Sequence, residues 1–234
     1  STHGIDLVLL TVDLLDGHGA FRETGDQLAQ ALGQMEAQVC IAPGNHDFLG
    51  GGSVWETVDW PENVHIFREP RMTALELPEL CAVVHGAAFT APEQAESLLA
   101  GFAAPADGRV HLGVLHGEID PAENRYDPLG KAEIAASGLA YLALGHIHKR
   151  TEPLRFGNTV CAWPGCPEGR GFDELGEKGF YQGTVTDGGQ VELAFVPFAR
   201  HRYEILEVDV TGETPREAVE AALPPDTARD LYRI

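Results

Sequence analysis

The chain has 234 residues, of which 44% are hydrophobic and 8% aromatic, as in ordinary globular proteins large enough for one sizeable core. Its formal net charge is −20 with neutral histidines, so the averaged surface repels a nucleic-acid backbone and a simple DNA-binding module is disfavoured. An enzyme that meets phosphate through bound cations is not excluded, because a metal ion reverses the local field of its site.

Sequence features also bear on the cellular compartment. Apolar runs such as 7–12 and 139–144 are much shorter than the roughly 20 residues of a membrane-spanning helix. The chain opens without a basic segment followed by an apolar one, so no signal peptide is expected. The cysteines form no CxxC pair, which favours reduced thiols over disulfides or a thiolate zinc site: Cys40, Cys81, Cys161 and Cys166. We therefore expect a cytoplasmic protein without membrane association.

The first 42 residues indicate a strand–helix–strand unit. Residues 6–12 form a continuous apolar run, which is typical of a strand buried on both faces. Residues 38–42 have the same character. Between these runs, apolar residues recur at helical spacing: Leu28, Ala31, Leu32 and Met35.

The following segments continue this alternation and then change character. Apolar strands are expected at 81–89, 110–115 and 139–144, and helices at 93–102 and 131–136. From about residue 154 the pattern favours antiparallel strands at 178–186, 190–198 and 202–210, with Asp187-Gly188-Gly189 as a turn. The predicted fold class is α/β, a two-layer mixed β-sheet sandwich flanked by helices in four α/β/β/α layers.

The C-terminal residues predict a second unit. Residues 211–223 have a helical pattern in which Thr214 is the candidate cap and Glu217 follows three positions later. Pro224 and Pro225 end this helix, and an apolar pattern starts again at 230–234. We expect a core at 1–210, without its first strand, and the start of a truncated C-terminal cap domain at 211–234.

Polar clusters follow four of the predicted buried strands, at the end where α/β sheets bind ligands. These clusters are Asp13, Gly44-Asn45-His46-Asp47, His116-Gly117 and Gly145-His146-Ile147-His148. A single histidine after a strand is more often structural than a ligand, and a lone aspartate is often a turn cap. Four such ends on one sheet edge instead indicate a cation site. Imidazole, carboxylate and amide ligands without thiolate favour Mn, Fe or Zn over Ca or Mg.

These motifs resemble the calcineurin-like metallophosphoesterases. The resemblance rests on DLLDG at 13–17, GNHD at 44–47, His116-Gly117 and GHIH at 145–148, and it covers about residues 5–210. The stretch 163–174 and Lys178-Gly179-Phe180 make the chain most similar to the SbcD-like DNA repair exonucleases, including their YhaO-type branch. The implied activity is nuclease hydrolysis of phosphodiester bonds.

The resemblance implies a role for each motif residue. Asp13 would bridge two divalent metal ions, with manganese favoured and iron or zinc as alternatives. Asn45, His116 and His146 would complete one metal site, and His148 would contribute to the other. His46 would contact the scissile phosphate and protonate the leaving oxygen, and Asp47 would orient His46. DNA, an SMC-like ATPase subunit and a second copy of the chain are the implied partners.

The chain departs from the family pattern at two places. The family has glycine before the bridging aspartate, where this chain has Val12. The family also opens with an Asp-x-His motif on an earlier strand, and we expect this chain to start after it. Asp16-Gly17-His18 has the same spacing but follows Asp13, and we interpret it as coincidence. One metal site would then keep only Asp13 and His148.

Three functional hypotheses therefore remain from the sequence. The first is a metal-dependent phosphodiesterase acting on DNA. The second is a phosphoesterase of nucleotides or small phosphodiesters, which suits the acidic surface better. The third is a non-catalytic subunit with a degenerate metal site, suggested by Val12 and the missing motif.

Overall fold

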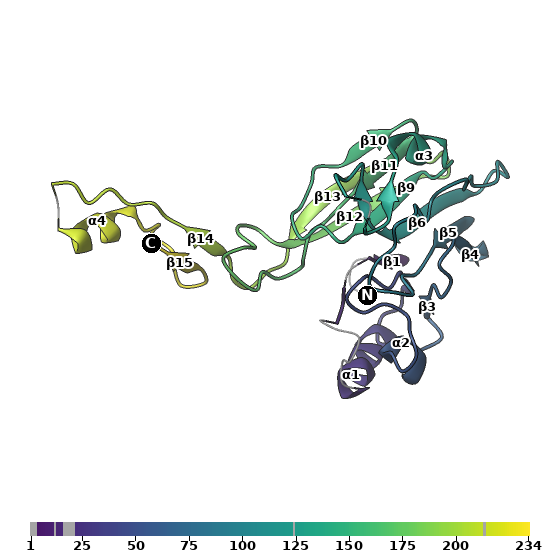
Figure 1. Cartoon of the computed structure of the whole chain (residues 1–234), viewed down its shortest axis with the longest axis horizontal. Coiled ribbons are helices and arrows are strands. Elements are labelled where there is room, and N and C mark those ends of the chain that lie inside the picture. Colours follow the sequence, from purple (N-terminus) through teal and green to yellow (C-terminus); the bar gives the residue numbers. More distant parts are fainter. Residues whose placement is uncertain (1–3, 12, 16–21, 124, 213) are drawn as a thin grey trace.

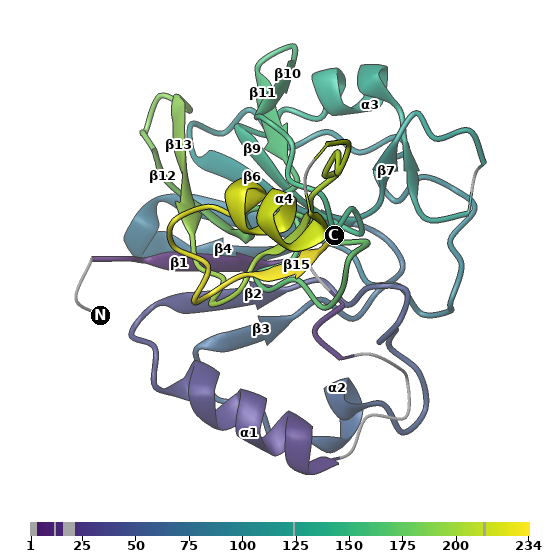
Figure 2. The same ribbon diagram turned by 90° about the vertical axis from the view of Figure 1, so that its left-hand side faces the viewer.

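The computed structural model describes residues 4–11, 13–15, 22–123, 125–212 and 214–234. Two β-sheets pack face to face, with helices on the outer face of each, and a C-terminal segment projects from this body (Figure 1). Turning the molecule by 90° shows the same two sheets with α1 and α2 beneath the smaller one (Figure 2). The predicted α/β sandwich is thus confirmed.

The smaller sheet is parallel, in the order β1-β2-β3. Its strands are β1 (Leu7–Leu10), β2 (Gln38–Ile41) and β3 (Val64–Ile66). Helices α1 (Arg22–Gly33) and α2 (Val54–Thr57) cover its outer face. The predicted strand–helix–strand unit is therefore present, with β1 ending at Leu10, earlier than expected.

The larger sheet is mixed, in the order β10-β11-β9-β6-β5-β4. Its inner strands β5, β6, β9 and β11 run parallel, and β4 and β10 are antiparallel edges. The strands are β4 (Thr73–Leu77), β5 (Ala82–Gly86), β6 (Val110–His116), β9 (Tyr141–Gly145), β10 (Leu154–Phe156) and β11 (Thr159–Ala162). Three short elements complete this half: the 3₁₀ turn Pro78–Leu80, the pair β7 (Glu118–Ile119) and β8 (Pro128–Leu129), and α3 (Lys131–Ala136).

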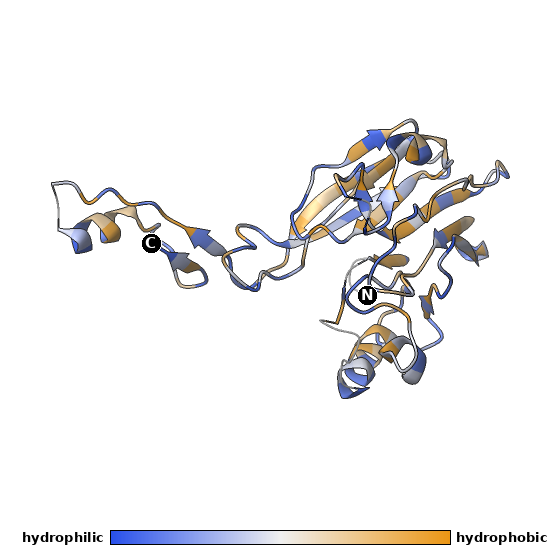
Figure 3. Cartoon of the chain, viewed as in Figure 1, coloured by the Kyte–Doolittle hydropathy of each residue, from blue (hydrophilic) through white to orange (hydrophobic). Residues whose placement is uncertain are grey.

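The alternation of side chains along the strands explains the four layers. On β2, Val39 and Ile41 pack with the helices of the small sheet, whereas Cys40, and Ala42 just after the strand, pack between the two sheets. Successive side chains of a strand point to opposite faces, so strands buried on both faces need apolar residues at every position. Figure 3 shows these strands largely in hydrophobic colours, while α1 carries both hydrophobic and hydrophilic residues. On the outer face of the larger sheet, another apolar cluster joins β6 and β9 to Ile134 of α3.

The remaining elements lie toward the C-terminus. β12 (Gly179–Val185) and β13 (Val191–Pro197) form the predicted hairpin. β14 (Tyr203–Ile205), α4 (Pro215–Ala222) and β15 (Leu231–Arg233) form the projecting segment (Figure 1). The Thr214 hydroxyl accepts the Glu217 N–H at 3.4 Å, as the capping pattern predicts. The division into a core at 1–210 and a cap from 211 stays a prediction.

Two predicted elements are wrong. Residues 93–102 form turns instead of a helix, and Gln94 makes an isolated parallel bridge with Tyr126. Residues 202–210 contain only the short β14, which pairs in parallel with β15 and not in an antiparallel meander. Among the described residues, every helix is too short or too polar to cross a lipid bilayer.

Candidate metal centre

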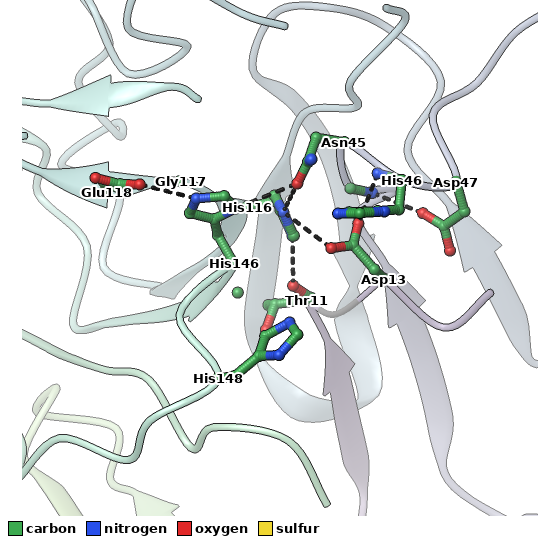
Figure 4. Close-up of polar contacts among 12 residues, drawn as sticks. Thr11, Asp13, Asn45, His46, Asp47, His116, Gly117, Glu118, His146 and His148 are labelled. Atoms are coloured by element: carbon green, nitrogen blue, oxygen red, sulfur yellow. Dashed lines mark hydrogen bonds and ion pairs between the residues drawn. The ribbon is translucent and has the colours of Figure 1, made fainter. Parts of the chain in front are cut away.

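The polar clusters named from the sequence follow β1, β2, β6 and β9 and meet where the two sheets touch. Asn45 lies at the centre of one group, which we call the Asn45 corner: Asp13, Asn45, His116 and His146 (Figure 4). The Asn45 side-chain oxygen lies 2.8 Å from His116 Nε2 and 3.2 Å from His146 Nδ1. His116 Nε2 also lies 3.6 Å from Asp13 Oδ2. Residues separated by more than 100 positions thus present ligand atoms to one point.

These separations suit ligands of a shared cation. Nitrogen and oxygen atoms bound at about 2.1 Å to one tetrahedral or octahedral ion lie roughly 3.0–3.4 Å apart. The distances between Asn45, His116 and Asp13 fall close to that range. The two imidazoles and the amide oxygen also form a donor set typical of Mn, Fe or Zn.

The three histidines predicted as metal ligands each have one ring nitrogen held by an oxygen acceptor. His116 Nδ1 lies 3.0 Å from the Thr11 carbonyl oxygen, and His146 Nε2 lies 2.8 Å from Glu118 Oε1. His148 Nδ1 lies 2.6 Å from Glu174 Oε1. A ring that donates its N–H in this way leaves the lone pair of its other nitrogen free for a metal ion. This orientation of three rings is the observation by which the residues present fit divalent cations.

Burial keeps the central imidazole neutral. His116 is 1% exposed, and burial lowers its pKa to about 4 despite the opposing effect of the Asp13 charge. A neutral imidazole is the form that binds metal. Burial alone would raise the pKa of Glu174, but hydrogen bonds from the Arg170 backbone N–H and from His148 hold it below its ordinary value. Glu174 is therefore a carboxylate at neutral pH.

Asp13 and His46 are neighbours across the two loops. The His46 backbone N–H donates to Asp13 Oδ1 at 3.0 Å, which leaves Oδ2 turned toward His116 (Figure 4). A carboxylate with one oxygen tied to the backbone is fixed in orientation while the other oxygen stays available. The structure thus brings His46 to the centre, and its predicted contact with substrate stays a prediction.

Asp47 is 2% exposed and turned toward the backbone. Its Oδ1 accepts the Gly44 N–H at 3.0 Å, and its Oδ2 accepts the Leu15 N–H at 3.2 Å. These bonds tie the loop after β2 to the loop after β1. Asp47 thus fixes the position of these two loops relative to each other. Its predicted role in orienting the His46 ring stays a prediction.

His148 lies in a separate group, the His148 corner: His148, Cys166 and Glu174. One ligand atom from each of these residues lies within 4.8 Å of the others. The His148 side chain is 44% exposed, in contrast to the 1% of His116. The Cys166 N–H and the Lys178 amine both donate to the His148 carbonyl oxygen, at 3.3 and 3.2 Å. The recorded side-chain contact of His148 is therefore with Glu174 and not with Asp13.

Backbone geometry also marks the centre. His146 has a positive φ of +88°, which is rare for residues other than glycine and costs energy that the surroundings must supply. A Cβ on Gly44 would lie 2.2 Å from Asp13 Oδ1, and one on Gly145 would lie 1.3 Å from the Thr11 carbonyl oxygen. Glycine is required at both positions because the loops approach so closely.

Comparison with known proteins agrees with this geometry. Residues 1–150 match the model of the calcineurin-like phosphoesterase family. This chain belongs to that family. Its members are metal-dependent phosphoester hydrolases. A metallophosphoesterase named YhaO and described as uncharacterized, from Bacillus subtilis (strain 168), is 33% identical over an alignment of 217 residues, and the match covers 88% of this chain and 52% of that protein. The chain thus spans about half the length of this curated relative.

The similarity to solved structures is more distant. One crystal structure with 13% sequence identity aligns with a TM-score of 0.44 over 76% of this chain and 72% of the other. A likeness at that level carries no information about the calcineurin-like site. The assignment therefore depends on the family match and on the arrangement of the strand ends.

Sequence reasoning missed two carboxylates of this phosphoesterase centre. Glu118 and Glu174 hold His146 and His148, from 28 and 26 positions away. The signal for Glu118 was its place two residues after His116, and Glu174 stood in the stretch that supported the family resemblance. Val12 and Asp16-Gly17-His18 lie outside the described residues.

Proposed function

We propose that the protein is a metal-dependent phosphodiesterase that cleaves DNA, in the manner of the SbcD-like nucleases that its motifs resemble. The observation that carries the proposal is the Asn45 corner, where the amide oxygen of Asn45 lies within 3.2 Å of two oriented imidazoles and one of these, His116, lies 3.6 Å from the Asp13 carboxylate. The ligands of this corner suit one divalent cation, and Asp13 with His148 would contribute to a second; manganese is our proposal for both. When bound, these cations polarise a phosphoryl group and supply a hydroxide nucleophile.

The residues of the chain divide the remaining work. Asp13, Asn45, His116 and His146 would hold one cation, and Asp13 with His148 would contribute to the other. His46 is tied to Asp13 through its backbone N–H, and its side chain would hold a non-bridging phosphate oxygen and donate a proton to the leaving oxygen. Glu118 and Glu174 hold the rings of His146 and His148 in register.

The nuclease proposal is tested with full-length protein, Mn²⁺ and end-labelled linear and closed circular DNA. We expect products from linear DNA, and His46→Ala should lower the rate by about 10²–10⁴-fold while leaving metal content unchanged, because general acids contribute about that much. His65→Gln is the matched control, since His65 lies on β3 and belongs to none of the strand-end clusters. Failure to cleave any form of DNA would remove the nuclease assignment.

A second candidate is a phosphoesterase of nucleotides or small phosphodiesters. The net charge of −20 favours it, because a strongly acidic surface slows the approach of a polyanion. Turnover of a chromogenic bis-ester compared with turnover of DNA by the same preparation decides between the two. A clear preference for the small ester would favour this second candidate.

Partners and metal content are further proposals. The family resemblance supports an SMC-like ATPase subunit and a homodimer, which co-purification and sedimentation of the full-length protein would test. Metal analysis after dialysis tests the ion proposal: two manganese ions per chain would support it and exclude a degenerate site. Fewer than one ion of any metal per chain would favour the non-catalytic hypothesis.

A further inference from the structure

Trp163 directly follows β11, the strand next to β9, and its indole reaches the strand ends that carry the metal centre. Its indole N–H is 2.8 Å from the Gly145 carbonyl oxygen and 3.1 Å from the Gly117 carbonyl oxygen. Gly117 follows His116, and Gly145 precedes His146. One donor therefore bridges the two strand ends that carry the imidazoles of the Asn45 corner.

The indole N–H supplies a link between β6 and β9 at the point where their backbone hydrogen bonding ends. The last paired residues of β6 and β9 are His116 and Gly145. Beyond them, the Gly117 N–H reaches the Gly145 carbonyl at a long 3.4 Å, and His146 turns away with its positive φ. The Trp163 side chain is 5% exposed, so this hydrogen bond is shielded from competing water.

The backbone of Trp163 reaches the third histidine segment. The Thr151 N–H donates to the Trp163 carbonyl at 3.0 Å, and the Trp163 N–H donates to the Thr151 hydroxyl at 3.3 Å. Thr151 stands three residues after His148, in the segment that leaves the GHIH motif. Trp163 is thus bonded to the segments of His116, His146 and His148 at once.

We propose that Trp163 is a positioning residue that holds these three histidine segments in the geometry required for metal binding. The inference rests on the proposed metal centre and deepens it. Outer partners of metal ligands typically change metal affinity by about 10–100-fold when removed, because the ligands then lose their fixed orientation. The Trp163 indole acts in the same way, although its N–H does not bond the imidazoles themselves. It holds the backbone carbonyls of Gly117 and Gly145, which are the chain neighbours of His116 and His146.

The test replaces the indole donor and keeps an aromatic ring. In the full-length protein, Trp163→Phe should raise the Kd for Mn²⁺ by roughly 10–100-fold. The absorption bands of bound Co²⁺ should also change in position or intensity, because they report ligand geometry. A merely structural role would lower the unfolding midpoint and leave the Co²⁺ spectrum of the folded protein as it is.

Trp60→Phe is the matched control, since the Trp60 indole nitrogen is buried and has no hydrogen-bond partner among the described residues. It should leave the Kd and the Co²⁺ spectrum at parental values. If Trp163→Phe does not fold, benzothienylalanine incorporated at position 163 keeps the shape of the side chain and removes only the N–H. The same changes in Kd and spectrum are then expected.

The outcomes separate this inference from the proposed function. A folded Trp163 variant with parental Kd and parental Co²⁺ bands would overturn the inference alone. A parent protein that binds metal but cleaves neither DNA nor small diesters would remove the proposed substrate and leave the inference standing. A parent protein that binds no divalent metal would overturn both.

Discussion

The Asn45 corner and the His148 corner are built differently, although both belong to one predicted centre. The first consists of residues at or shortly after the ends of buried strands, with His116 only 1% exposed and the imidazoles of His116 and His146 meeting at Asn45. The second consists of loop residues, with His148 44% exposed and held by Glu174. Strand ends deliver preorganised ligands, whereas loops deliver ligands that depend on local partners.

Gly145→Ala should have the largest effect, because it damages the first corner through the fold itself. The added Cβ would lie 1.3 Å from the Thr11 carbonyl oxygen, which belongs to the other sheet. The backbones must separate, so we expect loss of several kcal/mol of unfolding free energy, and a fall in soluble yield. Urea unfolding measures this, with Gly188→Ala in the turn between β12 and β13 as control. Equal stability of the two variants would contradict the close approach.

Removal of one imidazole from each corner compares them directly. His116→Ala should abolish tight Mn²⁺ binding, with a loss of more than about 100-fold, since removal of an outer partner alone costs 10–100-fold. His148→Ala should leave the Mn²⁺ affinity of the Asn45 corner unchanged and weaken only the binding of the second ion. Isothermal titration with Mn²⁺ resolves the two sites. The comparison fails if His148→Ala weakens both ions equally.

Neutralising the two orienting carboxylates gives a smaller effect. Glu118→Gln and Glu174→Gln should each lower metal affinity by about 10–100-fold. We expect the greater loss for Glu174→Gln, because His148 has no strand to fix it. Dialysis followed by metal analysis ranks the two variants, and Glu133→Gln, at the start of α3, is the control. The reverse ranking would show that the strand end alone does not orient His146.

The smallest predicted effect concerns Asp127, whose backbone carbonyl accepts the N–H of Glu118 on β7. Its Oδ1 accepts the Leu98 N–H, its Oδ2 has no partner among the described residues, and burial raises its pKa to about 7. A carboxyl whose pKa is higher in the folded state binds more protons there, so stability falls as pH rises through the window from about 4 to 7.

Asp127→Asn removes this titration. The unfolding free energy of the parent should fall by about 2 kcal/mol between pH 5 and 7 relative to the variant. Urea unfolding at several pH values measures the difference. Parallel pH profiles of parent and variant would show that Asp127 does not titrate in this window.

The sequence predicted the strand ends because their information is local. An apolar run followed by a polar residue marks a buried strand and its ligand, and β2 followed by Asn45 is an example. The helix expected at 93–102 failed for a non-local reason. Leu98 and Leu99 are buried, as in the expected helix, but the Asp127 carboxyl group accepts the Leu98 N–H and fixes a turn.

Pairings across long separations were equally invisible. Nothing next to Glu118 or Glu174 in the chain indicates which histidine each one holds. The pairing of β14 with β15 had no local signal either, because parallel partners need not be neighbours in sequence. Family resemblance supplied the ligand roles, and only the three-dimensional arrangement supplied the orienting residues.

The passage of the Thr11 carbonyl against Gly145 has a consequence for motion. At this seam the Thr11 carbonyl group lies directly against the backbone of Gly145, which has no side chain to separate the two chains. Sliding of one sheet over the other would require both chains to lift apart first. The seam between Thr11 and Gly145 therefore resists sliding of the two sheets and keeps the strand ends of the metal centre at a fixed separation.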